Sequence, residues 1–428
     1  MLYMKNRWLL LTAPIAGLLL TQGVQAQQPL QETDAAKVKV SAARLQRIDK
    51  TLQQYVDSSW LKGAVALIAK DGAIVYNKAF GTAAPGTTMQ KDAIFRIASQ
   101  TKAITSVAVM MLFEEGKLLL DDPVSRYIPS FAKPQVLDQF NEKDSSYTTM
   151  PAKREVTIRD LLTHTSGIGY AGIGAKKMKA IYAKAHIPSG IGSDTFHLHY
   201  AIPRLGSLPL EHNPGEKFTY GLNTDVLGYL VEVVSGIPLD RFFATRIFEP
   251  LGMKDTYFYL PAAKHTRLVT LYTTDKVTRQ LVPFKESPEM PVSAEYAKRN
   301  GSYFSGGAGL VSTVKDYAIF LQALLNGGTY NGKRILAPRT VELMTMNQVG
   351  DVMVGVNKFG LGFEITTDRG AAKIGASTGT FAWGGYFGTI YWADPQKKLV
   401  GLLFINQMPL THGEIQDKFK ALVYQSLD

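Results

Sequence analysis

The most informative segment of this 428-residue chain reads Phe95-Arg-Ile-Ala-Ser99-Gln-Thr-Lys102. Apolar residues then recur at helical spacing until Gly116 ends the pattern, so we expect a buried helix from about Ser99 to Glu115. Ser99 and Lys102 are nearly one helical turn apart, and their side chains therefore share a face. Serine becomes a nucleophile when a base lies within hydrogen-bond reach, and a buried lysine can act as that base. The segment marks Ser99 as a candidate nucleophile, with a helix-capping role as the alternative.

The Ser-x-x-Lys pattern is weak evidence by itself because three further copies begin at Ser59, Ser130 and Ser312. Ser59 follows the end of a predicted helix, where the helix dipole disfavours a developing negative charge. Ser130 lies in a loop that contains proline. Ser312 opens a helix, but we interpret it as an N-cap because Thr313-x-x-Asp316 forms a capping box. The context of these copies favours Ser99.

Two other sequence patterns could indicate a nucleophile or a metal site. Gly375-Ala-Ser377-Thr-Gly379 matches Gly-x-Ser-x-Gly, but the glycine-rich and aromatic residues that follow cannot form the helix that this motif requires in α/β-hydrolases. His197-Leu-His199 resembles part of a metal site, yet no further ligand spacing accompanies it. The chain has no cysteine, which excludes disulfides, thiolate metal ligands and a cysteine nucleophile. We expect neither a metal nor a cofactor.

The N-terminus reads as an export signal over residues 1–26. Lys5 and Arg7 form the basic region, an apolar stretch of 13 residues follows, and Val24-Gln-Ala26 supplies small residues for cleavage. Because a membrane span needs about 20 apolar residues, we expect a periplasmic or secreted protein with no lasting membrane insertion. The net charge of +11 is scattered without an arginine-rich stripe, so we expect no nucleic-acid partner.

Strand and helix patterns at both ends of the chain predict an α+β fold. Residues 64–69 and 73–79 form two strand-like runs on either side of the hairpin signal Lys70-Asp71-Gly72. Residues 389–392 and 399–405 form later strands, and helices are expected at 42–60, 225–234, 315–325 and 413–427. We expect one antiparallel sheet built from both chain ends and flanked by helices. The predicted domain spans 27–428, with a sheet lobe at about 42–98 and 300–428 and a helical, loop-rich lobe at about 99–299.

The segment around Ser99 resembles the nucleophile motif of the serine β-lactamase and penicillin-binding-protein superfamily. Within it, the chain is most similar to the class C β-lactamase-related esterases, the family VIII carboxylesterases. Three more ordered segments, at 158–167, 250–256 and 305–313, extend the resemblance over residues 44–428. Several ordered motifs are more specific than one tetrapeptide, and they favour Ser99 over Ser312.

The second and third motifs of the family appear in variant form. Tyr220 takes the tyrosine position, Leu222 replaces the asparagine of the β-lactamases, and Asn223 comes one residue late. Trp383-Gly384-Gly385 resembles the esterase form of the Lys-Thr-Gly motif, with Lys373-Ile-Gly375 as a rival. A tryptophan in the lysine position removes a cation that would hold a substrate carboxylate.

The resemblance implies an acyl-enzyme on Ser99, with Lys102 and Tyr220 sharing the proton transfers. The oxyanion is expected between the backbone N–H groups of Ser99 and Tyr386. Substrate contacts are expected from Trp383, Gly384, Gly385 and Asn223. The implied activity is hydrolysis of carboxylic esters. The alternatives are a β-lactamase, a D-amino-acid peptidase or amide hydrolase, and a non-catalytic protein that binds cell-wall fragments. The oligomeric state is left open.

Overall fold

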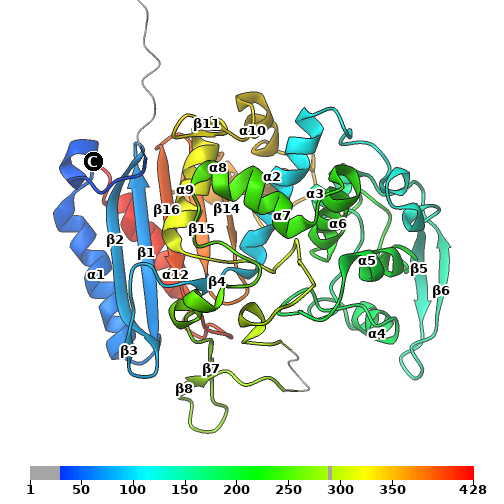
Figure 1. Cartoon of the computed structure of the whole chain (residues 1–428), viewed down its shortest axis with the longest axis horizontal. Helices are drawn as coiled ribbons and strands as arrows, with labels where there is room; N and C mark the ends of the chain where they lie inside the picture. Colours follow the sequence, from blue (N-terminus) through cyan, green and yellow to red (C-terminus); the bar gives the residue numbers. More distant parts are fainter. Residues whose placement is uncertain (1–28, 288–291) are drawn as a thin grey trace, which may run out of the picture.

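The computed structural model describes residues 29–287 and 292–428 (Figure 1). The predicted export signal at 1–26 lies outside these residues. Within the described part of the chain, no helix combines the length and apolarity that a membrane span requires.

An eight-stranded sheet is built from both ends of the chain, as the sequence predicts. Its strands, in spatial order, are β12 (Lys358–Phe359), β13 (Glu364–Ile365), β14 (Phe381–Gly384), β15 (Ile390–Asp394), β16 (Leu399–Phe404), β1 (Gly63–Lys70), β2 (Ala73–Ala84) and β3 (Thr87–Thr88). The two ends join where β1 pairs antiparallel with β16, with Val65 opposite Phe404. The hairpin between β1 and β2 turns at Asp71 and Gly72, which have φ angles of 51° and 79°.

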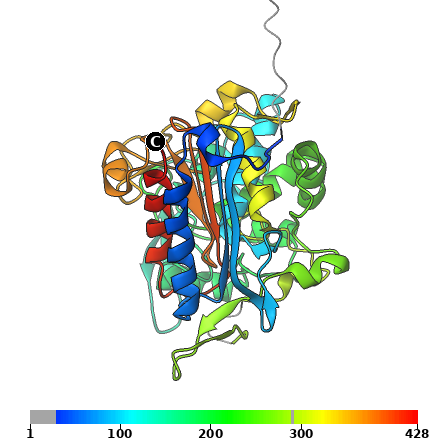
Figure 2. The same ribbon diagram turned by 90° about the vertical axis from the view of Figure 1, so that its left-hand side faces the viewer.

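Helices cover both faces of this sheet, which explains why β1 is buried along almost its whole length. On one face, α1 (Ala42–Asp57) and α12 (Glu414–Gln425) lie side by side, as Figure 2 shows. They pack on Ala64, Ala66 and Ile68, whereas Val65 and Leu67 face the larger core on the other side. That core includes α2 (Thr101–Glu114) and α9 (Val314–Leu325).

The middle of the chain forms the region to the right in Figure 1. Its helices are α3 (Ile158–Leu162), α4 (Lys176–Lys184), α5 (Leu198–Gly206), α6 (Asn223–Ser235), α7 (Leu239–Phe243) and α8 (Glu249–Leu251). Short strands form four two-stranded pairs: β4 (Phe95–Arg96) with β9 (Val311–Ser312), β5 (Gln135–Phe140) with β6 (Tyr147–Pro151), β7 (Tyr272–Thr274) with β8 (Leu281–Pro283), and β10 (Thr329–Tyr330) with β11 (Lys333–Arg334). The helices α10 (Pro338–Met344) and α11 (Asp368–Ile374) lie between strands of the C-terminal half. The β5–β6 hairpin is absent from the sequence-based expectation because β6 is exposed on both faces and has no apolar alternation.

Two helix starts differ in detail from the predictions. The helix expected from about Ser99 is present, but its first turn, η2 (Ala98–Gln100), is a 3₁₀ turn, and α2 begins at Thr101. The N-cap of α9 is Thr313 and not Ser312, since the Thr313 hydroxyl accepts the backbone N–H of Asp316. Both differences concern helix starts, where side-chain caps and 3₁₀ turns replace the regular hydrogen bonds of the α-helix.

Candidate active site

Ser99 sits in η2, the turn that connects strand β4 to helix α2, and is 7% exposed. The preceding strand is anchored by the fully buried side chain of Arg96. Its Nε donates to the carbonyl of Ala294 at 2.7 Å, and its Nη1 donates to the carbonyl of Val269 at 2.6 Å. Ala98 has a φ of 42°, a left-handed conformation that costs energy for a residue with a Cβ. The turn is therefore strained and is held by Arg96 on its N-terminal side.

Lys102 lies one turn later on α2 and is 2% exposed. Its Nζ lies 3.3 Å from the Ser99 Oγ, 2.8 Å from the hydroxyl oxygen of Tyr170 and 2.7 Å from the carbonyl oxygen of Gly307. An ammonium group has three donors, so these three acceptors satisfy it completely. The geometry couples the candidate nucleophile to a buried lysine whose orientation is fixed.

Tyr170 is a residue of this cluster that the sequence reasoning missed. It follows the segment 158–167 by three residues, but neither its spacing from Lys102 nor a motif of its own marks it as a contact of Lys102. Burial raises the pKa of the Tyr170 phenol well above its usual value, and the nearby groups Tyr220 and Asp225 raise it further. Tyr170 therefore stays a neutral phenol that accepts a hydrogen bond from Lys102.

Tyr220 reaches the same cluster from the loop before α6. The Lys102 Nζ lies 4.6 Å from the centroid of the Tyr220 ring. The Trp383 Nε1 of β14 donates to the Tyr220 hydroxyl at 3.2 Å. The structure thus brings together Ser99, Lys102, Tyr220 and Trp383, which are far apart in sequence.

The structure corrects the expectation that Asn223 contacts substrate. Asn223 is the first residue of α6 and is fully buried. Its Nδ2 lies 3.0 Å from the Nδ1 of His164, and its Oδ1 accepts the hydroxyl of Ser166. Burial lowers the pKa of His164 well below its usual value, and the charge of Lys102 acts in the same direction. Asn223 and a neutral His164 thus form internal contacts that support the loop of Tyr220.

The end of β14 approaches the turn that carries Ser99. A Cβ on Gly385 would lie 2.5 Å from the carbonyl oxygen of Ile97, so this approach requires glycine. The next residue is Tyr386, whose N–H donates to no acceptor among the residues that the structure describes. Free N–H groups beside a nucleophile suit a developing oxyanion. The assignment of the oxyanion site to Ser99 and Tyr386 stays a prediction.

A cavity of about 500 Å³ opens over these groups. Its walls near Ser99 consist of aromatic, aliphatic and glycine residues: Ile173, Ile191, Tyr220, Trp383, Gly384, Gly385 and Tyr386. Lys373 is exposed on α11 and does not line this cavity, so it does not supply the cation of the Lys-Thr-Gly motif.

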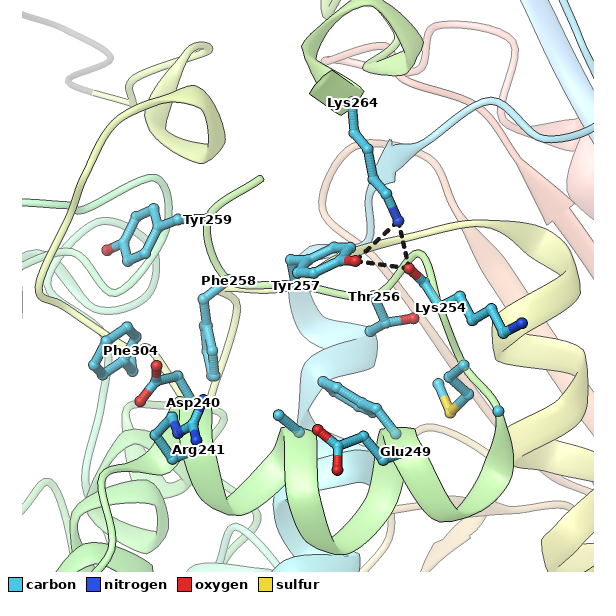
Figure 3. A pocket seen from close by; sticks show the side chains of 14 residues that line it. Asp240, Arg241, Glu249, Lys254, Thr256, Tyr257, Phe258, Tyr259, Lys264 and Phe304 are labelled. Atoms are coloured by element: carbon cyan, nitrogen blue, oxygen red, sulfur yellow. Dashed lines mark hydrogen bonds between the residues drawn. The ribbon is translucent and has the colours of Figure 1, made fainter. Parts of the chain in front are cut away.

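A larger cavity of about 690 Å³ lies elsewhere, between α7, α8 and the segment 252–259 (Figure 3). Its lining contains no serine, and the hydroxyl of its Thr256 is hydrogen bonded to Ser312 and Asp316. Ser312 is fully buried whereas Lys315 is exposed, so these two side chains do not form a reactive pair. This cavity therefore lacks the groups for acyl transfer that surround Ser99.

The remaining rival motifs also lack a reactive setting. Ser377 is followed by strand β14 and not by the helix of a nucleophile elbow. Ser130 lies in the 3₁₀ turn Pro129–Phe131, and Ser59 follows the C-terminal end of α1. His197 and His199 are exposed, with ring centroids 5.2 Å apart. Among residues 29–287 and 292–428, no group of three or more histidine or acidic residues is arranged to hold a metal ion.

Comparisons with known proteins agree with this arrangement. The family model described as "Beta-lactamase" matches residues 48–425. Esterase EstB of Burkholderia gladioli is 32% identical over 394 residues, which cover 87% of this chain and 93% of EstB. A protein of Escherichia coli K12 with the provisional name D-alanyl-D-alanine carboxypeptidase is 28% identical over 91% of this chain and 88% of its own length. The solved structure of EstCE1, "a hydrolase with promiscuous acyltransferase activity", superposes with a TM-score of 0.77 at 28% identity and covers 89% of this chain and 98% of its own.

Proposed function

The chain belongs to the β-lactamase family and is a serine hydrolase, and we propose that it cleaves carboxylic esters through an acyl-enzyme on Ser99. The observation that carries this proposal is the contact of 3.3 Å between the Ser99 Oγ and the Lys102 Nζ at the base of the cavity lined by Tyr220 and Trp383. The similarity to EstB, an esterase by name, supports the choice of ester over amide.

In the proposed mechanism, the Ser99 Oγ attacks the ester carbonyl and its proton passes to the Lys102–Tyr220 pair. The Lys102 Nζ lies 4.6 Å from the centroid of the Tyr220 ring, so we assign the proton to the pair and not to either group alone. The carbonyl oxygen becomes an oxyanion, which the N–H groups of Ser99 and Tyr386 stabilise. One such donor contributes about a hundredfold in rate. The tetrahedral intermediate then collapses, the C–O bond of the ester breaks, and the pair returns the proton to the leaving alcohol.

Deacylation repeats these steps with water. Tyr220 removes a proton from the water that attacks the acyl carbonyl, and the Ser99 oxygen leaves and regains a proton. The Trp383 Nε1 donates to the Tyr220 hydroxyl oxygen, a contact that orients the phenol toward the cavity. On its other side, the Tyr220 ring lies against the Lys102 Nζ.

Trp383 supports the preference for neutral esters. Its indole occupies the place in the motif where β-lactamases carry a lysine, and Lys373 does not line the cavity. The cavity wall around Ser99 is therefore aromatic and aliphatic. A substrate carboxylate would lose water there without gaining an ion pair.

A substrate screen tests the proposed activity. Purified protein is assayed with p-nitrophenyl esters of two to ten carbons, nitrocefin and a peptide that ends in D-Ala-D-Ala. We expect a kcat/KM for the best ester at least about 10³-fold above that for nitrocefin, equivalent to about 4 kcal/mol of transition-state binding. Nitrocefin turnover equal to ester turnover would overturn the ester assignment, and selective cleavage of the peptide would establish the peptidase alternative.

We also propose export with removal of residues 1–26, which rests on the basic, apolar and small-residue pattern of that segment. N-terminal sequencing of the protein recovered from the periplasm and medium of its host tests this. A mature chain that begins at Gln27 is the expected result, and an intact Met1 in the cytoplasmic fraction would contradict it.

A further inference from the structure

The cavity over Ser99 continues beyond the residues assigned to catalysis. Trp383 and Ala382 are neighbours on β14 and point to opposite faces of the sheet, yet both line the same cavity. Strand β13 pairs with β14 only at Phe381 and Ala382, so the edge at Trp383 and Gly384 is not covered by β13. The cavity therefore has lining residues on both faces at this edge, from Ser99 on one face to α12 on the other. Figure 2 shows the face that α12 covers.

The residues that line the cavity away from Ser99 include both apolar and charged side chains. Beyond Gly385 the cavity is lined by Ile374 of α11 and Ile390 of β15, which are apolar. At the far end it is lined by Glu364 of β13 and by Asp417 and Lys420 of α12. The same cavity thus holds the candidate nucleophile, an apolar wall that includes Trp392, and a cluster of charged side chains.

Lys420 is half-buried at this far end and makes no ion pair or hydrogen bond with any residue in the described part of the chain. Its Nζ lies 5.4 Å from the ring centroid of Trp392. Burial lowers the pKa of Lys420, while the nearby carboxylates Glu364, Asp417 and Asp394 act in the opposite direction. The donors of Lys420 are therefore available to a group that enters the cavity.

The charge balance at this end selects the kind of group. A substrate carboxylate would be attracted by Lys420 but repelled by Glu364 and Asp417. A substrate ammonium would be attracted by these two carboxylates but repelled by Lys420. A hydroxyl carries one donor and two acceptor sites, so it accepts from Lys420 and donates to a carboxylate at once. A charged terminus of either sign would lose its hydration in this half-buried end while facing a like charge, so the far end matches a neutral hydrogen-bonding group.

The acyl side of the substrate is the part that reaches this end. The leaving alcohol must lie beside Tyr220 and Lys102 to receive its proton, so the acyl chain extends from the carbonyl in the other direction. On the premise of the proposed esterase function, we propose that the passage past Gly385 to Lys420 is an acyl subsite. It takes a chain with a neutral polar terminus, such as a hydroxyl.

The test measures selectivity with p-nitrophenyl esters of six, eight and ten carbons. At each length the terminus is a methyl, hydroxyl, carboxylate or ammonium group. We expect the wild-type kcat/KM to be highest for the hydroxyl form at one length, at least tenfold above the carboxylate and ammonium forms. The ratio of hydroxyl to methyl should fall at least fivefold in Lys420→Met. Lys418→Met is the matched control, since Lys418 is on the same helix, contacts Tyr55 and does not line the cavity. It should keep the wild-type ratio.

The outcomes separate the two proposals. Turnover of none of the esters would refute the esterase function itself. If the methyl esters are turned over, two results would refute the acyl subsite alone. One is a preference for a charged terminus, and the other is a ratio of hydroxyl to methyl kcat/KM that is unchanged in Lys420→Met. The wild-type order of preference tests the subsite even if the Lys420 variant does not fold.

Discussion

The Nζ of Lys102 lies 2.8 Å from the hydroxyl oxygen of Tyr170, a shorter contact than its 3.3 Å approach to the Ser99 Oγ. Lys102 is thus held by a neutral phenol and by the carbonyl of Gly307 while it faces the candidate nucleophile. Tyr170 acts as a positioning residue, because it orients Lys102 and does not line the cavity.

Tyr170→Phe tests this positioning role. The variant removes one of the three acceptors of Lys102 and leaves the aromatic packing in place. We expect kcat for a short nitrophenyl ester to fall about tenfold with KM changed less than twofold, because the loss concerns proton transfer and not substrate binding. Tyr182→Phe is the control, since Tyr182 is also buried but its hydroxyl contacts the N–H of Gly169. An equal loss of kcat in both variants would assign Tyr170 a purely structural role.

Trp383→Phe tests the contact between the indole and Tyr220. Phenylalanine keeps an aromatic wall but lacks the Nε1 donor that lies 3.2 Å from the Tyr220 hydroxyl. We expect a five- to tenfold lower rate of deacylation, consistent with the loss of about 1 kcal/mol from one hydrogen bond. Burst kinetics with a nitrophenyl ester measure this step, and a larger burst followed by a slower steady state is the expected signature. A variant with wild-type deacylation would contradict the role of the indole.

Asp225 predicts a pH dependence of stability. It is fully buried, and burial raises its pKa to about 6, while hydrogen bonds and the charge of Lys102 oppose the rise. The folded protein holds the proton more tightly than the unfolded chain does, so this contribution to stability is present below pH 4. It is lost as the pH rises to about 6. The contribution amounts to about 3 kcal/mol.

Asp225→Asn removes this titration. In urea unfolding at pH 4 and at pH 7, the variant should gain stability relative to the wild type at pH 7 only. Asp138→Asn, at an exposed position on β5, is the control and should not alter the profile. An equal change in the free energy of unfolding of Asp225→Asn at both pH values would contradict the assignment of this pH dependence to Asp225.

Arg96→Met tests how the turn of Ser99 is held. The variant leaves the buried carbonyls of Ala294 and Val269 without their donor. We expect the free energy of unfolding to fall by about 3 kcal/mol, measured by urea denaturation. Arg339→Met, which breaks an exposed ion pair with Glu342, should cost less than about 1 kcal/mol. Equal effects of the two variants would show that Arg96 does not anchor β4.

The sequence predicts the sheet and its flanking helices because their signals are local and strong. The continuous apolar run of β1, the turn at Asp71-Gly72 and the amphipathic pattern of α1 each specify an element directly. The β5–β6 hairpin escapes prediction because its second strand buries no face, although Val136 and Leu137 of β5 belong to the main core.

The residues of the candidate site also fall into those with a local sequence signal and those without one. Ser99, Lys102, Tyr220 and Trp383 lie in recognisable motifs, and the structure brings them together. Tyr170 and the carbonyl of Gly307 are not identifiable from spacing, since their contacts to Lys102 join segments 68 and 205 residues away. Asn223 is predicted to contact substrate and does not. It lies one residue later than the asparagine of the β-lactamase motif, and at the start of α6 its side chain is buried.

The central claim, that Ser99 forms the acyl-enzyme, is tested most directly by labelling with a fluorophosphonate probe and mapping the adduct by peptide mass spectrometry. We predict one adduct per chain, on Ser99, and its loss in Ser99→Ala together with a fall in kcat for the ester of at least about 10⁴-fold. Ser312→Ala and Ser377→Ala should retain both the adduct and the activity. An adduct on Ser312 or Ser377, or ester hydrolysis that persists in Ser99→Ala, would contradict the account.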